Sequence, residues 1–78
     1  LQYPEIAAEN GVQGKVIVQF VVEKDGSISK ATVVRGVDAS LDKEALRVIN
    51  KMDKWQPGKQ GGKPVRVKYT LPIQFKLQ

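Results

Sequence analysis

The last stretch of the chain, residues 64–77, carries the strictest pattern in the sequence. Every odd-numbered position from Val65 to Leu77 is apolar, and every even-numbered position from Arg66 to Lys76 is polar or proline. This period of two predicts a β-strand with one face on a core and the other in solvent. Pro72 has no N–H to donate to a neighbouring strand, so we expect this strand to lie at the edge of its sheet.

A β-hairpin is predicted ahead of this strand, over residues 15–37. Residues 15–24 are apolar at every second position on one face and half apolar on the other, which indicates a central strand. Asp25-Gly26 follows, and this dipeptide is a strong signal for a tight hairpin turn. In the second strand, residues 27–37, the apolar residues change phase, and a β-bulge near Lys30 would reconcile the two halves.

Two helices complete the predicted elements. A short one has Pro4 at its first position and Gly11 at its C-terminal cap. The second begins with Ser40 as its N-cap and continues until Pro57-Gly58 stops it. Its apolar residues recur at helical spacing and form one stripe: Leu41, Ala45, Val48, Ile49 and Met52.

The order helix, strand, strand, helix, strand predicts an α+β domain. The long helix carries the chain back across the sheet, so that the last strand lies beside the first and antiparallel to it. We therefore expect a three-stranded antiparallel sheet in the order 2-1-3, with both helices on one face. Trp55 is expected to cover the core beyond the second helix, and residues 59–63 to form an exposed, flexible connection.

Composition narrows the range of functions. The 78 residues suffice for one small domain, and since the chain begins at Leu1 rather than Met, we expect it to be a fragment of a longer protein. There is no histidine and no cysteine, and the eight carboxylates have no metal-ligand spacing. We expect no catalysis, no metal and no cofactor, while the net charge of +5 favours an acidic partner.

Phosphate-binding and nucleic-acid-binding motifs are not supported. Residues 58–63 resemble a phosphate-binding loop but lack its first glycine and its Ser or Thr. Residues 11–14 match an RNA-binding clamp loop, but that loop lies between two helices, and here a strand follows it. Stacking on bases requires aromatic rings among the cations, and the basic row Arg66, Lys68 and Lys76 contains none. We therefore rank nucleic acid well below a peptide as the partner.

An ordered set of short motifs spans nearly the whole chain. They are Tyr3-Pro4, the alternating run from Gly14 to Val22, Asp25-Gly26, Leu41-Asp42-x-Glu44-Ala45, Trp55-x-Pro57-Gly58, Gly62-Lys63-Pro64-Val65 and Leu71-Pro72-Ile73-x-Phe75. Each motif is short, but together and in this order they resemble the C-terminal domain of TonB-type energy transducers.

The resemblance implies a non-catalytic domain in the periplasm of a Gram-negative bacterium. In the family, a proline-rich spacer joins the domain to an inner-membrane helix that works with a proton-driven ExbB–ExbD motor. The domain adds the TonB box, a short peptide of an outer-membrane transporter, as a strand to the edge of its last strand and transmits energy for uptake of nutrients such as siderophores. The box-binding residues implied here are Val65, Arg66, Val67, Lys68, Tyr69, Thr70, Leu71 and Gln74.

Pro72 also indicates which residues of the last strand turn their backbone N–H and C=O groups to the free edge. The N–H and C=O of one residue point to the same side of an antiparallel strand, and alternate residues share that side. With Pro72 on the free side, we expect Arg66, Lys68, Thr70 and Gln74 to present their backbone groups to the partner.

The sequence departs from the best-known family members in two places. A glutamine of their first helix that touches the transporter plug aligns with Ala8, and Glu5 and Ala8 are the plug contacts expected here. The segment around Trp55 resembles the Bacteroidetes-type branch, in which some relatives are fused to sensors or peptidases. The alternative role is therefore a sensory or self-associating domain, including a homodimer formed by edge-to-edge pairing.

Overall fold

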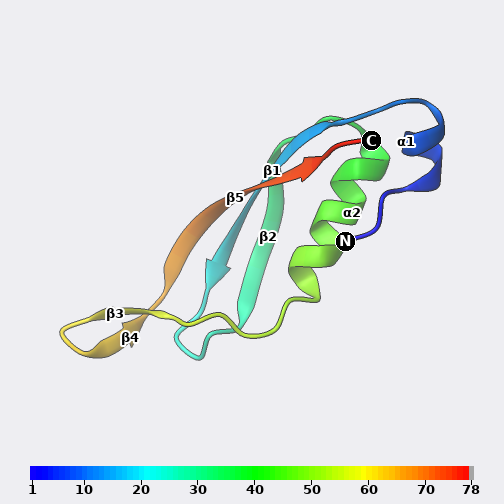
Figure 1. Ribbon diagram of the computed structural model, residues 1–78. Coiled ribbons are helices and arrows are strands. Elements are labelled where there is room, and N and C mark those ends of the chain that lie inside the picture. Colours follow the sequence, from blue (N-terminus) through cyan, green and yellow to red (C-terminus); the bar gives the residue numbers. More distant parts are fainter. Residues whose placement is uncertain (78) are drawn as a thin grey trace.

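The computed structural model describes residues 1–77 and contains the predicted elements with one addition. The elements are α1 (Glu5–Glu9), β1 (Gly14–Val22), β2 (Ile28–Arg35), α2 (Ala39–Asn50), β3 (Gly58–Gln60), β4 (Lys63–Val65) and β5 (Val67–Phe75). Strands β2, β1 and β5 form an antiparallel sheet in that order (Figure 1). Since β5 is the last strand, this is the predicted 2-1-3 order, and the α+β fold class is confirmed.

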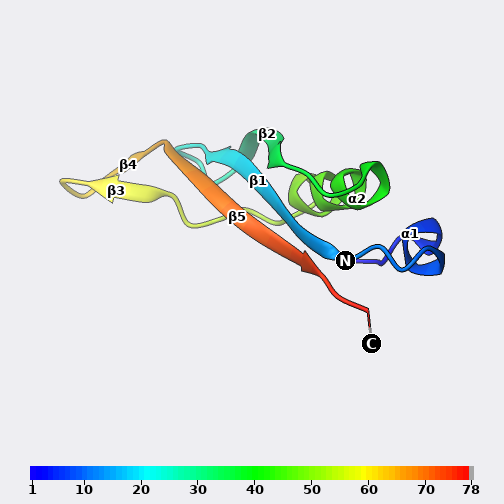
Figure 2. The same cartoon turned by 90° about the horizontal axis from the view of Figure 1, so that it is seen from above.

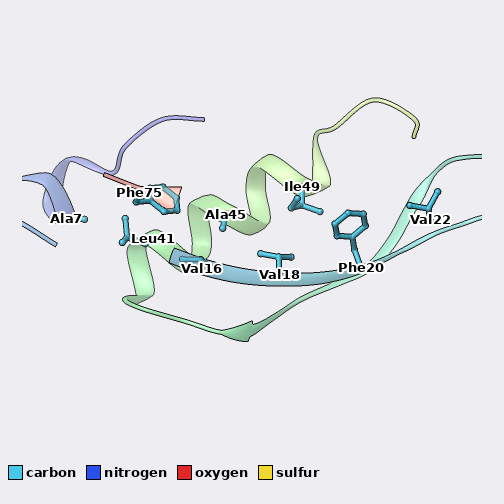
Figure 3. Packing of buried hydrophobic residues seen from close by; sticks show 9 residues of the cluster. All are labelled: Ala7, Val16, Val18, Phe20, Val22, Leu41, Ala45, Ile49 and Phe75. Carbon is cyan, nitrogen blue, oxygen red and sulfur yellow. The ribbon is translucent and has the colours of Figure 1, made fainter. Parts of the chain in front are cut away.

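Helix α2 packs on one face of this sheet, as predicted, while α1 lies beside α2 near the end of the sheet and contributes Ala7 to the same core (Figure 2). The even-numbered residues of β1 point to that face, and the buried stripe of α2 lies over them (Figure 3). The core consists of Ala7, Val16, Val18, Phe20, Val22, Leu41, Ala45, Ile49 and Phe75. Within residues 1–77, no polar or charged side chain is buried. The short helix α1 is too short to be stable alone, because it has only five residues. It is stabilised by a tertiary contact, the burial of Ala7 in this core.

The β1–β2 turn and the segment after α2 hold each other in place. Glu23 donates its backbone N–H to Ser27 (2.8 Å), which closes the predicted Asp25-Gly26 turn, and Gly26 takes a positive φ of 88°. The backbone N–H of Trp55 donates to the carbonyl of Gly26 (2.9 Å). A Cβ at Gly26 would overlap the carbonyl oxygen of Trp55, so only glycine fits this contact.

Trp55 covers the end of the core nearest the β1–β2 turn, as predicted. Its ring centre lies 5.2 Å from that of Phe20 and 5.5 Å from that of Tyr69. The predicted end of α2 at Pro57 is wrong, because the helix already ends at Asn50. The residues that follow must be extended to carry Trp55 beneath Gly26 and against Phe20.

The predicted helix starts differ from the structure by one or two residues. Pro4 occupies the N-cap of α1 rather than its first helical position. The N-cap of α2 is Asp38 rather than Ser40, because the Asp38 carboxylate accepts the backbone N–H of Ser40 (3.0 Å). The C-cap of α1 is Asn10 rather than Gly11, which follows it with a φ of 68° and an N–H that donates to the carbonyl of Ala8 (3.1 Å).

Strand β2 contains the predicted bulge. Lys30 has a φ of 52°, the one non-glycine residue with positive φ among residues 1–77, and the pairing with β1 shifts between Gln19 and Val21. A second shift lies between Ile17 and Val18, and it leaves Val34 as the extra residue, 52% exposed. Strand β2 is therefore irregular at two points along its length.

The predicted flexible connection at residues 59–63 is wrong. Strands β3 and β4 pair with each other, and Gly61 and Gly62 form the turn with φ values of 59° and 79°. Two successive positive φ values are the signature of a type I′ hairpin turn. This ribbon also divides the predicted last strand, because Arg66 lies outside both β4 and β5. It projects from the body and makes the molecule 49 Å long but only 20 Å wide (Figures 1 and 2).

Candidate functional site

The candidate site is the outer edge of β5. This strand pairs with β1 without irregularity from Gly14–Phe75 to Val22–Val67. On its other side, no strand within residues 1–77 pairs with it (Figure 2). The site is thus a row of unpaired backbone groups on an otherwise ordered sheet.

One hydrogen bond fixes which backbone groups face outward. Glu23 donates its N–H to Ser27, so it points toward β2, and alternate residues of β1 share that direction. The even-numbered residues of β1 therefore point toward β5, where they pair with odd-numbered residues such as Leu71. It follows that the even-numbered residues of β5 turn their backbone groups to the free side: Lys68, Thr70, Pro72 and Gln74.

This outward direction of the even-numbered backbone groups explains how Pro72 is accommodated inside a strand. Its missing N–H would face the free side, so no bond to β1 is lost. Lys68, Thr70 and Gln74 each offer one N–H and one C=O, and Pro72 offers its C=O alone. The edge therefore provides seven backbone groups for a partner strand, with one interruption.

The side chains beside this edge differ between the two faces of the sheet. On the helix-free face, the side chains of Lys68, Thr70 and Gln74 are exposed. On the helix face, Leu71 is half-buried, and the Tyr69 ring lies 6.1 Å from the ring of Phe20 while 36% of the residue stays exposed. An added strand would therefore meet polar side chains on one face and an apolar border on the other.

Two of the residues predicted for the site do not lie on the β5 edge. Val65 belongs to β4 and pairs with Gly58 of β3. Arg66 lies between the strands, and its guanidinium forms an ion pair with Glu23 (Nε–Oε1 2.8 Å). Ser29 donates a hydrogen bond to the same carboxylate, and Ser29 and Arg66 together lower the pKa of Glu23. Val67, Tyr69 and Leu71 lie in β5 but point their backbone groups toward β1.

The residues predicted to touch a transporter plug lie at the other end of the molecule. Glu5 is exposed and Ala8 is half-buried, and α1 lies near Phe75, whose ring centre is 5.6 Å from that of Tyr3. An open cleft of about 520 Å³ separates the start of the chain from α2. The structure thus places Glu5 and Ala8 near the C-terminal end of β5, away from Lys68.

Polar groups border this cleft. Glu44 pairs with Arg47 (2.6 Å) and accepts the backbone N–H of Gln2 (2.8 Å), and these bonds lower the pKa of Glu44 to about 2.

Among residues 1–77, no group of three carboxylates, histidines or cysteines is placed to hold a metal. No helix in the described part of the chain has the length and apolar character needed to span a membrane.

Comparison with known proteins decides the family. The sequence model of the family described as "Gram-negative bacterial TonB protein C-terminal" matches residues 1–77. The chain belongs to this family. The predicted resemblance to TonB-type C-terminal domains is thereby confirmed, and the family is a non-enzymatic one.

The relatives and solved structures agree with this assignment. Protein TonB of Vibrio cholerae is 34% identical over 79 residues, covering 99% of the chain and 32% of that protein. Protein TonB of Pseudomonas aeruginosa is 31% identical over 77 residues, covering 97% of the chain and 22% of that protein. The chain therefore spans about a third or less of these relatives.

Two solution structures of the Helicobacter pylori TonB C-terminal domain share the fold. One has a TM-score of 0.75 at 27% identity and covers 99% of the chain and 69% of its own length. The other has a TM-score of 0.71 at 26% identity, with 96% and 78% covered. The Bacteroidetes-type branch stays a prediction.

Proposed function

We propose that this chain is the periplasmic C-terminal domain of an inner-membrane-anchored TonB-type transducer. In this proposal the domain binds the TonB box of outer-membrane transporters by adding it as a strand to β5, and it transmits energy from an ExbB–ExbD motor for nutrient uptake. The motor would be reached through parts of the protein outside these 78 residues. The observation that carries the proposal is the regular, unpaired edge of β5 in a domain of this family.

The number of free backbone groups supports a weak and reversible complex. Each bond in a strand pair contributes roughly 0.5–1.5 kcal/mol net, and the partner must be ordered on binding. The three residues that offer both groups, together with the Pro72 carbonyl, therefore give only modest affinity. This suits a partner that must be engaged and released in each transport cycle.

The side chains beside the edge supply the selectivity. Alternate residues of an added strand point to opposite faces of the sheet. On the helix face they would lie beside Tyr69 and Leu71, which favours apolar residues. On the other face they would lie beside Lys68 and Thr70, which favours polar or acidic residues. The predicted plug contacts, Glu5 and Ala8, form a second and separate surface in this proposal.

Calorimetric titration with peptides from the periplasmic N-terminal segments of outer-membrane transporters tests the proposal. Thr70→Pro removes one N–H from the free edge and none from the β1–β5 ladder, so we expect affinity to fall at least about tenfold while the fold persists. Thr70→Val is the matched control, because it changes the side chain and keeps the backbone donor. Equal affinity for both variants would show that the partner does not use this edge.

Self-association is the second candidate function, because a second copy could use the same unpaired edge. Sedimentation equilibrium distinguishes it from peptide binding. A dimer that Thr70→Pro dissociates, in a chain that binds no transporter peptide, would favour self-association over the transducer role.

A further inference from the structure

The charge of this molecule is concentrated at one end. We define the ribbon end as β3, β4, the β1–β2 turn, residues 51–57 and the adjoining ends of β2 and β5. Its cations are Lys24, Lys30, Lys51, Lys54, Lys59, Lys63, Arg66 and Lys68, and its carboxylates are Glu23, Asp25 and Asp53. The rest of the chain holds five cations and five carboxylates, so the net charge of +5 lies at the ribbon end.

These cations are available to a partner. All eight are on exposed residues. Within residues 1–77, the ion pairs are Glu44–Arg47 and Glu23–Arg66, so none of the seven lysines is paired. At the base of the ribbon, Lys30, Arg66 and Lys68 also border an open hollow of about 300 Å³.

The shape of the ribbon end restricts the kind of partner. The ribbon is a narrow projection (Figure 2). Residues 59–64 at its tip are all exposed and carry no apolar side chain except that of Pro64. A specific protein partner would need an apolar interface centre, and single-stranded nucleic acid would need free aromatic rings. Trp55 and Tyr69, the nearest rings, pack against each other and against Phe20 on the helix face.

Binding to a membrane surface requires neither an apolar interface centre nor free aromatic rings. Anionic lipid headgroups form an extended negative plane and move laterally to meet flexible lysines, each of which contributes separately. We propose that the ribbon end is a docking surface for a membrane leaflet rich in anionic phospholipids. The inference goes beyond peptide binding at the β5 edge and does not rest on it.

Co-sedimentation with lipid vesicles tests the proposal. We expect the chain to bind phosphatidylcholine vesicles that contain about one-third phosphatidylglycerol at about 50 mM salt, and to dissociate as salt is raised. Pure phosphatidylcholine vesicles should retain almost none of it. The ribbon variant Lys59→Gln/Lys63→Gln should bind about twenty-five-fold more weakly, at about five-fold for each lysine removed.

The matched control is Lys43→Gln/Lys76→Gln, which lowers the net charge equally but leaves the ribbon end intact. We expect it to change vesicle binding by less than about two-fold, because its sites lie beyond the screening length of about 10 Å. Equal losses in both variants, or no preference for anionic vesicles, would overturn the proposal. Binding to a DNA duplex at equal phosphate concentration, as tight and as dependent on Lys59 and Lys63, would overturn the lipid assignment.

The proposal of peptide binding at β5 and the proposal of membrane docking at the ribbon end can be tested independently. Lys59 and Lys63 lie outside β5, so the ribbon variant should bind transporter peptides with the affinity of the unaltered chain. Loss of vesicle binding with intact peptide binding is the expected result for that variant.

Discussion

The sheet has two outer edges, and they are built differently. The edge of β5 belongs to a strand that pairs with β1 in uninterrupted register over all nine residues. The edge of β2 belongs to a strand with two register shifts, with Lys30 at positive φ and Val34 as an extra residue. Both strands flank the same central strand, so the difference arises within the edge strands themselves.

The difference indicates which edge a partner strand can use. Bulges bend a strand and break the even spacing of its outward N–H and C=O groups, so an irregular edge is a poor template. Strand β2 is protected in this way. Strand β5 keeps an even row, and only Pro72 and the charged Lys68 limit indiscriminate pairing. We therefore infer that β2 is the guarded edge and β5 the receptive one.

The largest expected effect is a difference in stability between proline substitutions on the two sides of β5. Leu71→Pro removes an N–H that points to β1, so we expect it to lower the free energy of unfolding by about 3 kcal/mol or more. Thr70→Pro removes an N–H on the free side, and we expect a loss of about 1 kcal/mol or less. Urea unfolding followed by circular dichroism measures both. Similar losses in the two variants would mean that the assigned phase is wrong.

The next effect concerns the turn from which β2 starts. Gly26→Ala places a Cβ against the carbonyl of Trp55 at a positive φ, and we expect it to cost about 2–4 kcal/mol. Gly62→Ala also has a positive φ, but its Cβ would meet nothing within 4 Å, so we expect about 1 kcal/mol. Thermal unfolding of the pair checks this, and a cost for Gly26→Ala no larger than that for Gly62→Ala would contradict the Trp55 contact.

A smaller, stabilising effect tests the bulge at Lys30 in β2, the guarded edge. Lys30→Gly relieves the positive φ of the bulge, and we expect it to raise the free energy of unfolding by up to about 1 kcal/mol. Lys24→Gly, at an exposed position without positive φ, should lower it instead. A destabilising Lys30→Gly would show that β2 is regular at this point.

The smallest effect concerns Glu23, whose carboxylate links the two edge regions through Ser29 and Arg66. Its pKa is lowered in the fold, first by the Ser29 hydrogen bond and then by Arg66. The stabilisation is therefore complete above the unfolded pKa of 4.5 and is lost as pH falls below it. We expect Glu23→Gln to lower Tm slightly at pH 7, with the difference disappearing in acid. A difference that persists at pH 2 would contradict this account.

Local pattern was sufficient to predict most of the sheet. The alternation in residues 65–77, the Asp25-Gly26 turn and the phase change near Lys30 predicted the strand β5, the hairpin turn and the bulge, because each depends on neighbouring residues. Pro72 gave the phase of the free edge in the same way. These features follow from backbone chemistry that a short stretch of sequence contains.

The missed features depend on contacts between distant residues. Helix α2 ends at Asn50 because Trp55 must reach Gly26, and no signal near residue 50 reveals this. The β3–β4 ribbon had a local signal, since Gly61-Gly62 suits a two-residue turn, but its three-residue strands are too short to show a period. Two of the residues predicted to bind the TonB box, Val65 and Arg66, lie outside β5, because Val65 belongs to the ribbon and Arg66 lies between β4 and β5.

Residue-resolved amide hydrogen exchange, with and without a transporter-derived peptide, tests the central claim most directly. In the free chain, the amides of Lys68, Thr70 and Gln74 should exchange rapidly, while those of Tyr69, Leu71 and Ile73 should be protected by their bonds to β1. Peptide should protect the first three and leave β2 unchanged. Protection that appears along β2 instead, or that does not alternate along β5, would contradict the assignment of the receptive edge.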